Sequence, residues 1–371
     1  MRESDKKNLM VFIEPTPYIL DLLEKGFDNL HETCDVVFLT QNLTQQWDLK
    51  LRVEKYLVVT SKKKILQIYV DTFIKRKYRL LHVAGWSNPF IIFLILMSRL
   101  LFIPVVVETD TSLNSSLAVW KKIIKKLVYP ILLKFPVFFL PGGTRQTRYL
   151  VHYGVNPKKI MNAQMTVDVK YINEYVKKIN VTKREKLREK NGAHVDDVIF
   201  LFVGRLLDWK GVRELIAAFK ITNNDRAKLW IVGDGELNTE VELASKQNKK
   251  IRYFGRVSGD YLWNIYHAAD VFVVPSYHEP WGLVINEAMA VGLPVIATNN
   301  VGCIDDLVEN NQQGLIVQSQ NVDELLKAMN DMLQNSEKKR LMARNAMDRI
   351  LGWTLQNEAK NIMSAWKKVC H

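Results

Sequence analysis

Two glutamates with a glycine between them form the most informative group of residues in this chain. Glu279 and Glu287 are eight positions apart, and Gly282 lies between them. The apolar run 270–274 precedes them and small apolar residues follow, which predicts a strand, a loop and a helix. Backbone amides near Gly282 and Leu283 would then lie at a helix N-terminus, where anions bind. Carboxylates accept hydrogen bonds from hydroxyls and repel phosphate, so the group predicts a sugar-nucleotide site.

A second group of residues supplies positive charge. Gly204, Arg205 and Lys210 follow the apolar run 198–203 and precede a helical pattern at 212–219. Gly204 permits a tight turn, and the two cations suit a diphosphate, with arginine as a planar fork and lysine as a point charge. Taken alone, the pattern also fits two solvated surface cations.

Two shorter glycine motifs are less specific. The segment 232–236 lacks the full spacing of a dinucleotide-binding loop and also fits a plain strand-to-helix turn. The segment 254–258, which contains Val257, could pass close to a nucleotide base, or it could be a loop with a helix cap at Ser258.

Short apolar strands alternate with longer helical patterns along the whole chain. This alternation predicts parallel sheets with helices on both faces. Two such sets predict an α/β protein with two doubly wound, Rossmann-like domains that face each other across a ligand-binding cleft. We expect an N-terminal domain at 1–175, a C-terminal domain at 190–350 and a last helix at 351–371 that packs back toward the N-terminal domain. The predicted strands are 9–14, 35–40, 80–84, 104–108, 136–140, 198–203, 229–232, 251–254, 270–274, 294–297 and 314–317.

The composition limits the class of protein. A hydrophobic content of 48% and a charged content of 25% are typical of a globular protein. Three scattered cysteines without a C-x-x-C pair favour a reducing compartment and argue against structural disulfides or a zinc site. The N-terminus predicts no signal peptide. The apolar block 90–98 is shorter than the roughly 20 residues of a spanning helix, so we expect a buried helix there.

The positive charge is concentrated in the first half. Residues 1–190 contain 32 Lys and Arg against 17 Asp and Glu, whereas residues 191–371 contain 20 against 22. At 120–128, apolar residues and the lysines between Lys121 and Lys126 alternate with helical spacing, which predicts an amphipathic helix. This helix either docks on an anionic membrane surface or packs on its domain with a solvated lysine face. Nucleic-acid binding is a weaker interpretation, because no nucleic-acid motif accompanies the charge.

Together, the motifs resemble those of family 4 retaining glycosyltransferases, which have the GT-B fold. The resemblance is carried by Gly204-Arg205 with Lys210, by the segment 254–257 and by the Glu279-x7-Glu287 spacing. It implies that Arg205 and Lys210 bind the donor diphosphate and that Glu279 contacts hydroxyls of the donor sugar. It also implies that the backbone at Gly282 and Leu283 meets sugar and phosphate, that Glu287 holds the ribose and that Val257 lies beside the base.

The sequence departs from the family pattern at two places. The Gly-Gly loop that often follows the first strand is replaced by residues 14–18, which puts donor contacts from the N-terminal domain in doubt. Where many members carry a histidine, this chain has Asp110, which either contacts the sugar or acceptor hydroxyl or caps a helix or turn.

The resulting hypothesis is a retaining, metal-independent hexosyltransferase. It would move a sugar from a UDP- or GDP-type donor to a glycan or lipid-linked acceptor at the cytoplasmic face of the membrane, without a cofactor. The predicted catalytic residues are Glu279, Arg205, Lys210 and Asp110. Two alternatives are a nucleotide-sugar epimerase of similar fold, which needs no acceptor, and a non-catalytic partner subunit of a glycosyltransferase.

Overall fold

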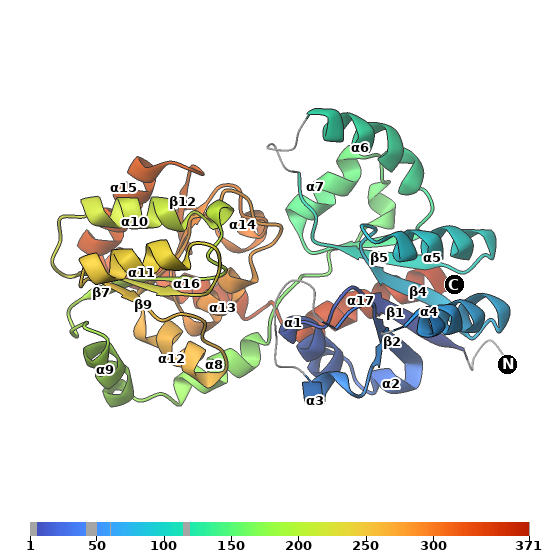
Figure 1. The fold of residues 1–371 in the computed structure, drawn as a ribbon, viewed down its shortest axis with the longest axis horizontal. Helices are drawn as coiled ribbons and strands as arrows, with labels where there is room; N and C mark the ends of the chain where they lie inside the picture. Colours follow the sequence, from blue (N-terminus) through green and yellow to red (C-terminus); the bar gives the residue numbers. More distant parts are fainter. Residues whose placement is uncertain (1–5, 42–49, 60, 114–118, 371) are drawn as a thin grey trace. The chain divides into compact units, whose positions relative to one another are not determined.

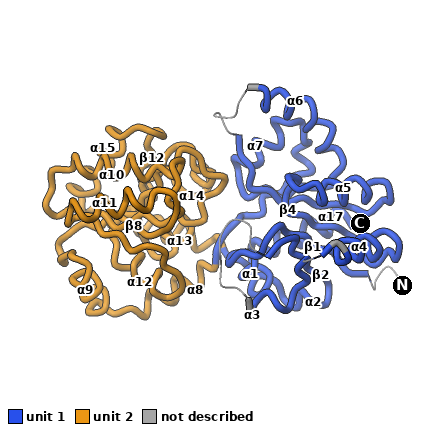
Figure 2. The backbone as a smooth tube through the Cα atoms, viewed as in Figure 1, with its two compact units in different colours: residues 1–167, 354–371 blue, residues 168–353 orange. Residues whose placement is uncertain are grey.

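The chain divides into two compact units in a computed structural model that describes residues 6–41, 50–59, 61–113 and 119–370. Unit 1 contains residues 1–167 and 354–371, and unit 2 contains residues 168–353 (Figure 2). The first unit thus ends eight residues before the expected bound of 175, and residues 168–189 belong to the second unit. Residues 354–371 are part of the first unit.

Unit 1 is built on a six-stranded parallel sheet with the order β3-β2-β1-β4-β5-β6 (Figure 1). Side chains of β1 alternate between the two faces, as the two-residue period of a strand requires. Met10 and Phe12 pack in the core that α17 and η2 cover, whereas Leu9 and Val11 pack in the core that α4, α5 and α7 cover. The elements of this unit are β1 (Lys7–Phe12), α1 (Pro17–Asp21), η2 (Leu22–Gly26), α2 (Leu30–Thr33), β2 (Cys34–Phe38), α3 (Lys50–Val53), β3 (Leu57–Val58), α4 (Lys62–Tyr69), η3 (Val70–Ile74), β4 (Tyr78–Ala84), α5 (Pro89–Leu100), β5 (Val105–Thr109), α6 (Val119–Leu132), β6 (Phe138–Pro141), α7 (Thr144–His152), η4 (Pro157–Lys159) and α17 (Leu355–Cys370).

Unit 2 repeats the plan with a second six-stranded parallel sheet, in the order β12-β11-β10-β7-β8-β9. One face of this sheet packs against α10, α11 and α15. Its elements are α8 (Val169–Lys177), α9 (Val181–Lys190), β7 (Val198–Val203), η5 (Asp208–Lys210), α10 (Val212–Ile221), β8 (Ala227–Val232), α11 (Asn238–Gln247), β9 (Ile251–Tyr253), α12 (Asp260–Ala268), β10 (Val271–Val274), α13 (Leu283–Val291), β11 (Val295–Thr298), α14 (Ile304–Leu307), β12 (Gly314–Val317), α15 (Val322–Gln334) and α16 (Ser336–Ile350).

The two doubly wound sheets confirm the predicted fold class. Each of the eleven predicted strands is present, with ends that shift by no more than two residues. The two-residue edge strand β3 was not predicted, because two residues carry no readable alternation. The apolar block at 90–98 lies within α5, and no described helix is long and apolar enough to cross a membrane.

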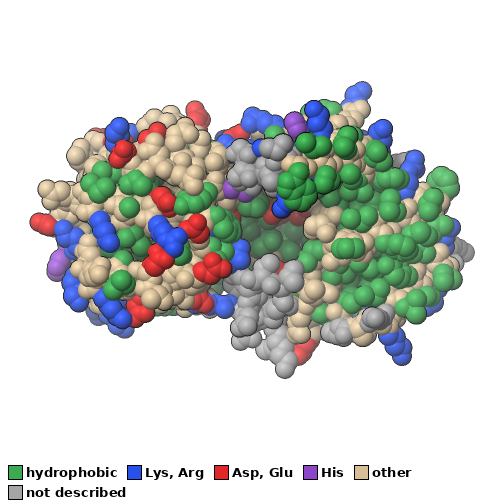
Figure 3. Space-filling model, turned by 45° about the horizontal axis from the view of Figure 1, so that its top comes forward, with side chains coloured by type: hydrophobic (Ala, Val, Ile, Leu, Met, Phe, Trp, Pro, Cys, Tyr) green, Lys and Arg blue, Asp and Glu red, His purple; other side chains and the backbone are tan. Residues whose placement is uncertain are grey.

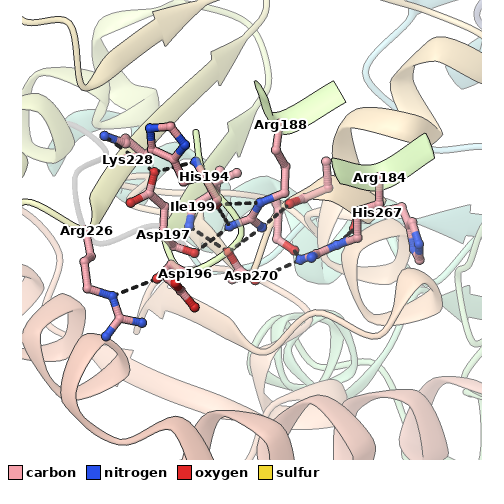
Figure 4. Close-up of polar contacts among 12 residues, drawn as sticks. Arg184, Arg188, His194, Asp196, Asp197, Ile199, Arg226, Lys228, His267 and Asp270 are labelled. Atoms are coloured by element: carbon pink, nitrogen blue, oxygen red, sulfur yellow. Dashed lines mark hydrogen bonds and ion pairs between the residues drawn. The ribbon is translucent and has the colours of Figure 1, made fainter. Parts of the chain in front are cut away.

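Helix α9 is fastened to the second sheet by a buried arginine (Figure 4). Only 1% of Arg188 is exposed, and its guanidinium donates to the carbonyl oxygens of His194, Asp197 and Ala268 and to the Asp270 carboxylate. Arg184 also donates to Asp270, at 2.9 Å. These bonds make α9, most of which lies between the expected domain bounds of 175 and 190, an integral part of unit 2.

Candidate active site

The predicted donor residues gather where the second sheet changes direction. Strands β8 and β9 follow β7 on one side, whereas β10 lies on the other side of β7. In open α/β sheets, ligands bind outside the carboxyl ends of the strands at such a switch point. The loop after β7 carries Arg205 and Lys210, and the loop after β10 carries Glu279. The topology therefore brings together two motifs that are about 70 residues apart in the sequence.

The loop after β7 holds its two cations beside an aromatic ring. The Lys210 Nζ lies 4.5 Å from the centre of the Trp209 ring, and the Arg205 guanidinium lies 5.7 Å from it. The loop ends at Gly211, whose φ of 72° and closeness to Pro275 admit no side chain, since a Cβ would lie 2.1 Å from the Pro275 oxygen. The Tyr277 amide also donates to the Trp209 carbonyl, at 2.8 Å. These contacts fix the two loops against each other.

Glu279 lies at the centre of this contact. Its Oε2 accepts from Lys210 Nζ at 2.5 Å and from Ser276 Oγ at 3.3 Å. Its backbone amide donates to Asn300, and its carbonyl accepts from Gly302. A carboxylate held at both backbone and side chain is preorganised to accept hydrogen bonds from a ligand.

The N-terminus of α13 follows three residues later. Gly282, with φ of 101°, is its cap residue, and no described side chain caps the helix there. A Cβ on Gly282 would lie 2.9 Å from Val301 Cγ1, so the backbone approaches its neighbour closely. The amides of the first turn, starting at Leu283, carry the positive end of the helix dipole and suit a phosphate.

Glu287 lies further along α13 and is half-buried. The Tyr266 hydroxyl donates to its Oε2 at 2.7 Å. Burial raises the pKa of Glu287 to about 7, although the Tyr266 hydrogen bond acts in the opposite direction. The side chain therefore changes charge near neutral pH, and its ionised form is a strong acceptor for a pair of hydroxyls.

The glycine loops after β8 and β9 lie at the same edge of the sheet. Gly204 donates to the Val232 carbonyl, and Gly233 donates to the Gly255 carbonyl at 2.9 Å. Val257 follows β9 and is half-buried. The segment around Gly233 leads from β8 to α11, and a single α11 side chain, Asn238, bonds the Gly235 amide, which supports the strand-to-helix interpretation.

Asp110 is the one predicted site residue that lies in unit 1. It is exposed and follows β5 directly. All the other predicted site residues are in unit 2. Among the described residues, no group of three His, Cys, Asp or Glu side chains is placed to hold a metal ion.

Two residues of this site were not predicted from the sequence. Ser276 bonds Glu279, and Tyr266 bonds Glu287. Ser276 could have been found from its place directly after the strand that ends before Pro275. Tyr266 carried no such signal, because it lies on α12, 21 positions before the carboxylate it orients.

The second unit matches a known family. Residues 183–349 match the family model described as Glycosyl transferases group 1. This part of the chain is similar to group 1 glycosyl transferases. The matched region contains every predicted donor residue, from Gly204 to Glu287.

The chain is also similar to curated glycosyltransferases. The chain is 33% identical to an uncharacterized glycosyltransferase of Methanocaldococcus jannaschii over 203 residues, which cover 53% of this chain and 52% of the relative. It is 30% identical to the capsular polysaccharide biosynthesis glycosyltransferase CapM of Staphylococcus aureus over 172 residues, or 44% of each chain. The chain thus spans about half the length of the curated relatives it matches.

Solved structures show the fold of the whole chain. The crystal structure of Anabaena HepE in complex with UDP has a TM-score of 0.79 at 16% identity and covers 98% of this chain and 100% of its own. HepE has also been solved in complex with UDP-glucose, with a TM-score of 0.75. The chain therefore has the GT-B fold of two Rossmann-like domains.

Proposed function

We propose that the chain is a retaining, metal-independent glycosyltransferase that moves a hexose-type sugar from a nucleotide-diphosphate donor. The observation that carries the proposal is the Lys210–Glu279 pair beside the N-terminus of α13, within the region similar to group 1 glycosyl transferases and at the switch point of its sheet. The UDP and UDP-glucose complexes of HepE support a sugar nucleotide as the donor.

The chemistry follows from where charge develops. Breaking the bond between sugar and diphosphate leaves an oxocarbenium-like sugar and additional negative charge on the phosphate. Arg205, Lys210 and the first amides of α13 stabilise that charge, and one such donor is typically worth about 10²–10³ in rate. Glu279 holds sugar hydroxyls, and Glu287 holds the ribose. The leaving phosphate takes the acceptor's proton on the face from which it departs, which retains the anomeric configuration without a protein nucleophile.

A thermal-shift screen of UDP-, GDP- and ADP-glucose tests donor binding. A donor at 100 times its dissociation constant adds about 2.7 kcal/mol to the free energy of unfolding, which raises the melting temperature. Glu287→Ala abolishes this shift, and Glu309→Ala, an exposed glutamate of the same unit, retains it. A Glu287→Ala protein with full donor affinity would contradict the ribose assignment.

Product analysis tests the reaction type. We expect transfer to a glycan or lipid-linked acceptor from a membrane extract, with an α-configured donor giving an α-linked product and with full activity in EDTA. An inverted product would refute the mechanism. Epimerised donor formed without extract would instead identify an epimerase, and donor binding without turnover would identify a partner subunit.

The place of the reaction is proposed to be the cytoplasmic face of the membrane, with α6 as the docking element. An ordinary amphipathic helix buries its apolar face, yet six apolar side chains of α6 are between 48% and 67% exposed, while Tyr129 and Leu132 pack against the core of unit 1. Lys121, Lys122 and Lys126 on the same helix are exposed too. Figure 3 shows many hydrophobic side chains on the side of unit 1 that faces the viewer. A helix with exposed apolar and basic side chains suits an anionic lipid surface. The exposed apolar residues of α6 are Trp120, Ile123, Ile124, Leu127, Val128 and Ile131.

Vesicle sedimentation tests this docking. We expect binding to vesicles with phosphatidylglycerol and much weaker binding to pure phosphatidylcholine. Replacing Lys121, Lys122 and Lys126 by glutamine weakens binding roughly a hundredfold, at about 1 kcal/mol per lysine. The matched control replaces three exposed lysines of α9, Lys183, Lys186 and Lys190, and leaves binding unchanged. Equal loss in both triple variants would contradict a docking role for α6.

A further inference from the structure

Unit 1 contains a hollow of about 410 Å³ at the carboxyl ends of its central strands, called here the β1–β4 hollow. Strands β2 and β3 follow β1 on one side, and β4 lies on the other side, so the sheet changes direction between β1 and β4. Each of the loops that follow β1, β4 and β5 contributes residues to the wall of the hollow. It therefore occupies the position where doubly wound sheets bind ligands.

Three carboxyl groups line the hollow: Glu14, Glu108 and Asp110. Glu14 is 8% exposed, and Asp110 lies at the exposed end of β5. The neighbouring Tyr18 also lines the hollow. Burial and the negative charges of Asp110, Glu108 and Glu14 raise the pKa of the Tyr18 hydroxyl, so it remains a hydrogen-bond donor at all ordinary pH values.

Glu108 is oriented by a hydrogen bond with a buried histidine. His82 is fully buried, and its Nε2 lies 3.0 Å from Oε2 of Glu108. The other ring nitrogen, Nδ1, accepts from the indole N–H of Trp366 at 3.1 Å. Because Nδ1 is an acceptor, Nε2 carries the proton and donates to Glu108. This bond orients the Glu108 carboxylate, which lines the hollow.

Aromatic rings form another part of the wall. Trp86, Tyr129 and Tyr149 line the hollow, and the Trp86 and Tyr129 ring centres are 6.0 Å apart. The Tyr149 hydroxyl is buried and makes no hydrogen bond of good geometry among the described residues, although Tyr129 is near it. A buried hydroxyl without a hydrogen bond lowers the stability of the fold unless a ligand or a water supplies the missing partner.

The charges of unit 1 are thus divided between two places. Among the described residues that line the hollow, Lys125 is the single cation, against three carboxyl groups. It lies over the Tyr129 and Tyr149 rings, 5.5 Å and 5.7 Å from their centres. The exposed lysines of α6 are outside the residues that line the hollow. The exposed lysines of α6 therefore do not offset the three carboxyl groups of the hollow, and the hollow is acidic.

We infer that the β1–β4 hollow binds the acceptor of the proposed transfer as an uncharged sugar or an amino sugar, and that it excludes acceptors with a carboxylate or phosphate on the reacting ring. Hydroxyl and ammonium groups donate to carboxylates, and the apolar face of a sugar ring packs on aromatic side chains. An anion would be repelled by carboxylates in a partly desolvated site. This inference rests on the proposed function and narrows its glycan or lipid-linked acceptor to one whose reacting ring carries no carboxylate or phosphate.

A panel of acceptors tests the inference with the full chain and the donor found by thermal shift. Octyl gluco-, galacto- and mannopyranosides are compared with the corresponding octyl aminoglycosides and octyl uronosides. We expect kcat/KM for the best neutral or amino sugar to exceed that of its uronoside at least tenfold. Uronosides used as well as their neutral counterparts, or no transfer to any neutral or amino sugar, would overturn the inference.

Charge-removing variants provide the second arm. In the Glu14→Gln/Glu108→Gln protein, kcat/KM for the neutral sugar falls at least tenfold, while the ratio of uronoside to neutral sugar rises. A misfolded protein cannot produce that rise, and donor-induced thermal shift confirms the fold. Asp28→Asn, at an exposed acid of the same unit that does not line the hollow, changes neither value. An unchanged ratio in the double variant would also overturn the inference.

The two levels of the proposal fail separately. A chain that binds no sugar nucleotide would refute the proposed function. A chain that binds and turns over a donor, yet transfers to uronosides as readily as to hexosides, would refute the acceptor class alone.

Discussion

The Nζ of Lys210 lies 2.5 Å from Oε2 of Glu279, and the pair joins the loops after β7 and β10. Both side chains are mostly buried, with 14% and 13% exposed, so each charge depends on the other. In the proposed donor complex, the diphosphate competes with Glu279 for the lysine. Under the proposed function, phosphate binding to Lys210 frees the Glu279 carboxylate to accept hydrogen bonds from the donor sugar.

Replacing Lys210 by methionine is expected to lower kcat by about 10²–10³, because one preorganised charge on the leaving diphosphate is lost. Steady-state kinetics with the identified donor measure the effect. The matched control is Lys220→Met, at an exposed lysine that ends the adjacent helix α10 and should retain full activity. A Lys210→Met protein within threefold of the parent kcat would exclude this lysine from catalysis.

Strand positions and the donor motifs were predictable, because short apolar runs and glycines can be recognised directly in the sequence. The hydrogen-bond partners of the site side chains were not predictable in this way. The Lys210–Glu279 pair spans 69 positions and Tyr266 reaches Glu287 from another helix, so both depend on the order of strands in the sheet. The expected bound of the first domain, 175, lies later than the observed bound, 167, for a similar reason. Charged side chains at 177–190 are expected to be solvated in a linker, whereas the Arg188 side chain is buried in unit 2.

Glu287 gives unit 2 a pH-dependent stability. Its folded pKa of about 7 lies above the ordinary value of 4.5, so the folded state binds more protons between these values. The contribution is fully present below about pH 4.5 and is lost as the pH rises through 7. Glu287→Gln does not titrate, so its stability relative to the parent should rise by about 3 kcal/mol between pH 4.5 and 8.5, at 1.36 kcal/mol per pKa unit. Urea unfolding at both pH values measures this difference, and a constant difference would contradict the raised pKa.

The same titration should control donor affinity. In the proposed donor complex, the ionised Glu287 accepts hydrogen bonds from both ribose hydroxyls, whereas the protonated form has less capacity to accept. The dissociation constant of the donor is therefore expected to fall as the pH rises from 6 to 8, with a midpoint near 7 in the free protein. Calorimetric titrations across this range measure it. Glu287→Gln should bind weakly with no midpoint near 7, and a midpoint that persists in the variant would assign the titration to another group.

Arg188 should be a major determinant of the stability of unit 2. Its replacement by methionine removes the guanidinium donor from three backbone carbonyls, of which that of His194 keeps the Asp197 amide, and leaves Asp270 with Arg184 as its remaining arginine partner. Breaking a buried ion pair from one side costs about 3–5 kcal/mol. Chemical denaturation measures the loss. Arg226→Met is the matched control, because that exposed side chain makes one bond, to Asp196, and its loss should cost less than about 1 kcal/mol (Figure 4). Equal losses in the two variants would contradict the central role of Arg188.

Trp366 connects the last helix to the β1–β4 hollow. It stacks on Phe27, with ring centres 5.7 Å apart, and its indole N–H donates to His82, which in turn donates to Glu108. Trp366→Phe keeps a ring but removes the donor, so His82 is free to move its proton to Nδ1 and to stop donating to Glu108. We expect a loss of about 1–3 kcal/mol in stability from the unpaired nitrogen.

The kinetic result distinguishes positioning from packing. If His82 orients Glu108 for the acceptor, Trp366→Phe raises the acceptor KM severalfold and leaves the donor dissociation constant unchanged. Trp120→Phe, at a tryptophan that is 60% exposed on α6, controls for a general effect of the substitution when both variants are assayed with a soluble octyl glycoside and without membrane. A Trp366→Phe protein that loses stability but keeps its acceptor KM would show that the chain of hydrogen bonds is structural and that Glu108 needs no support from α17.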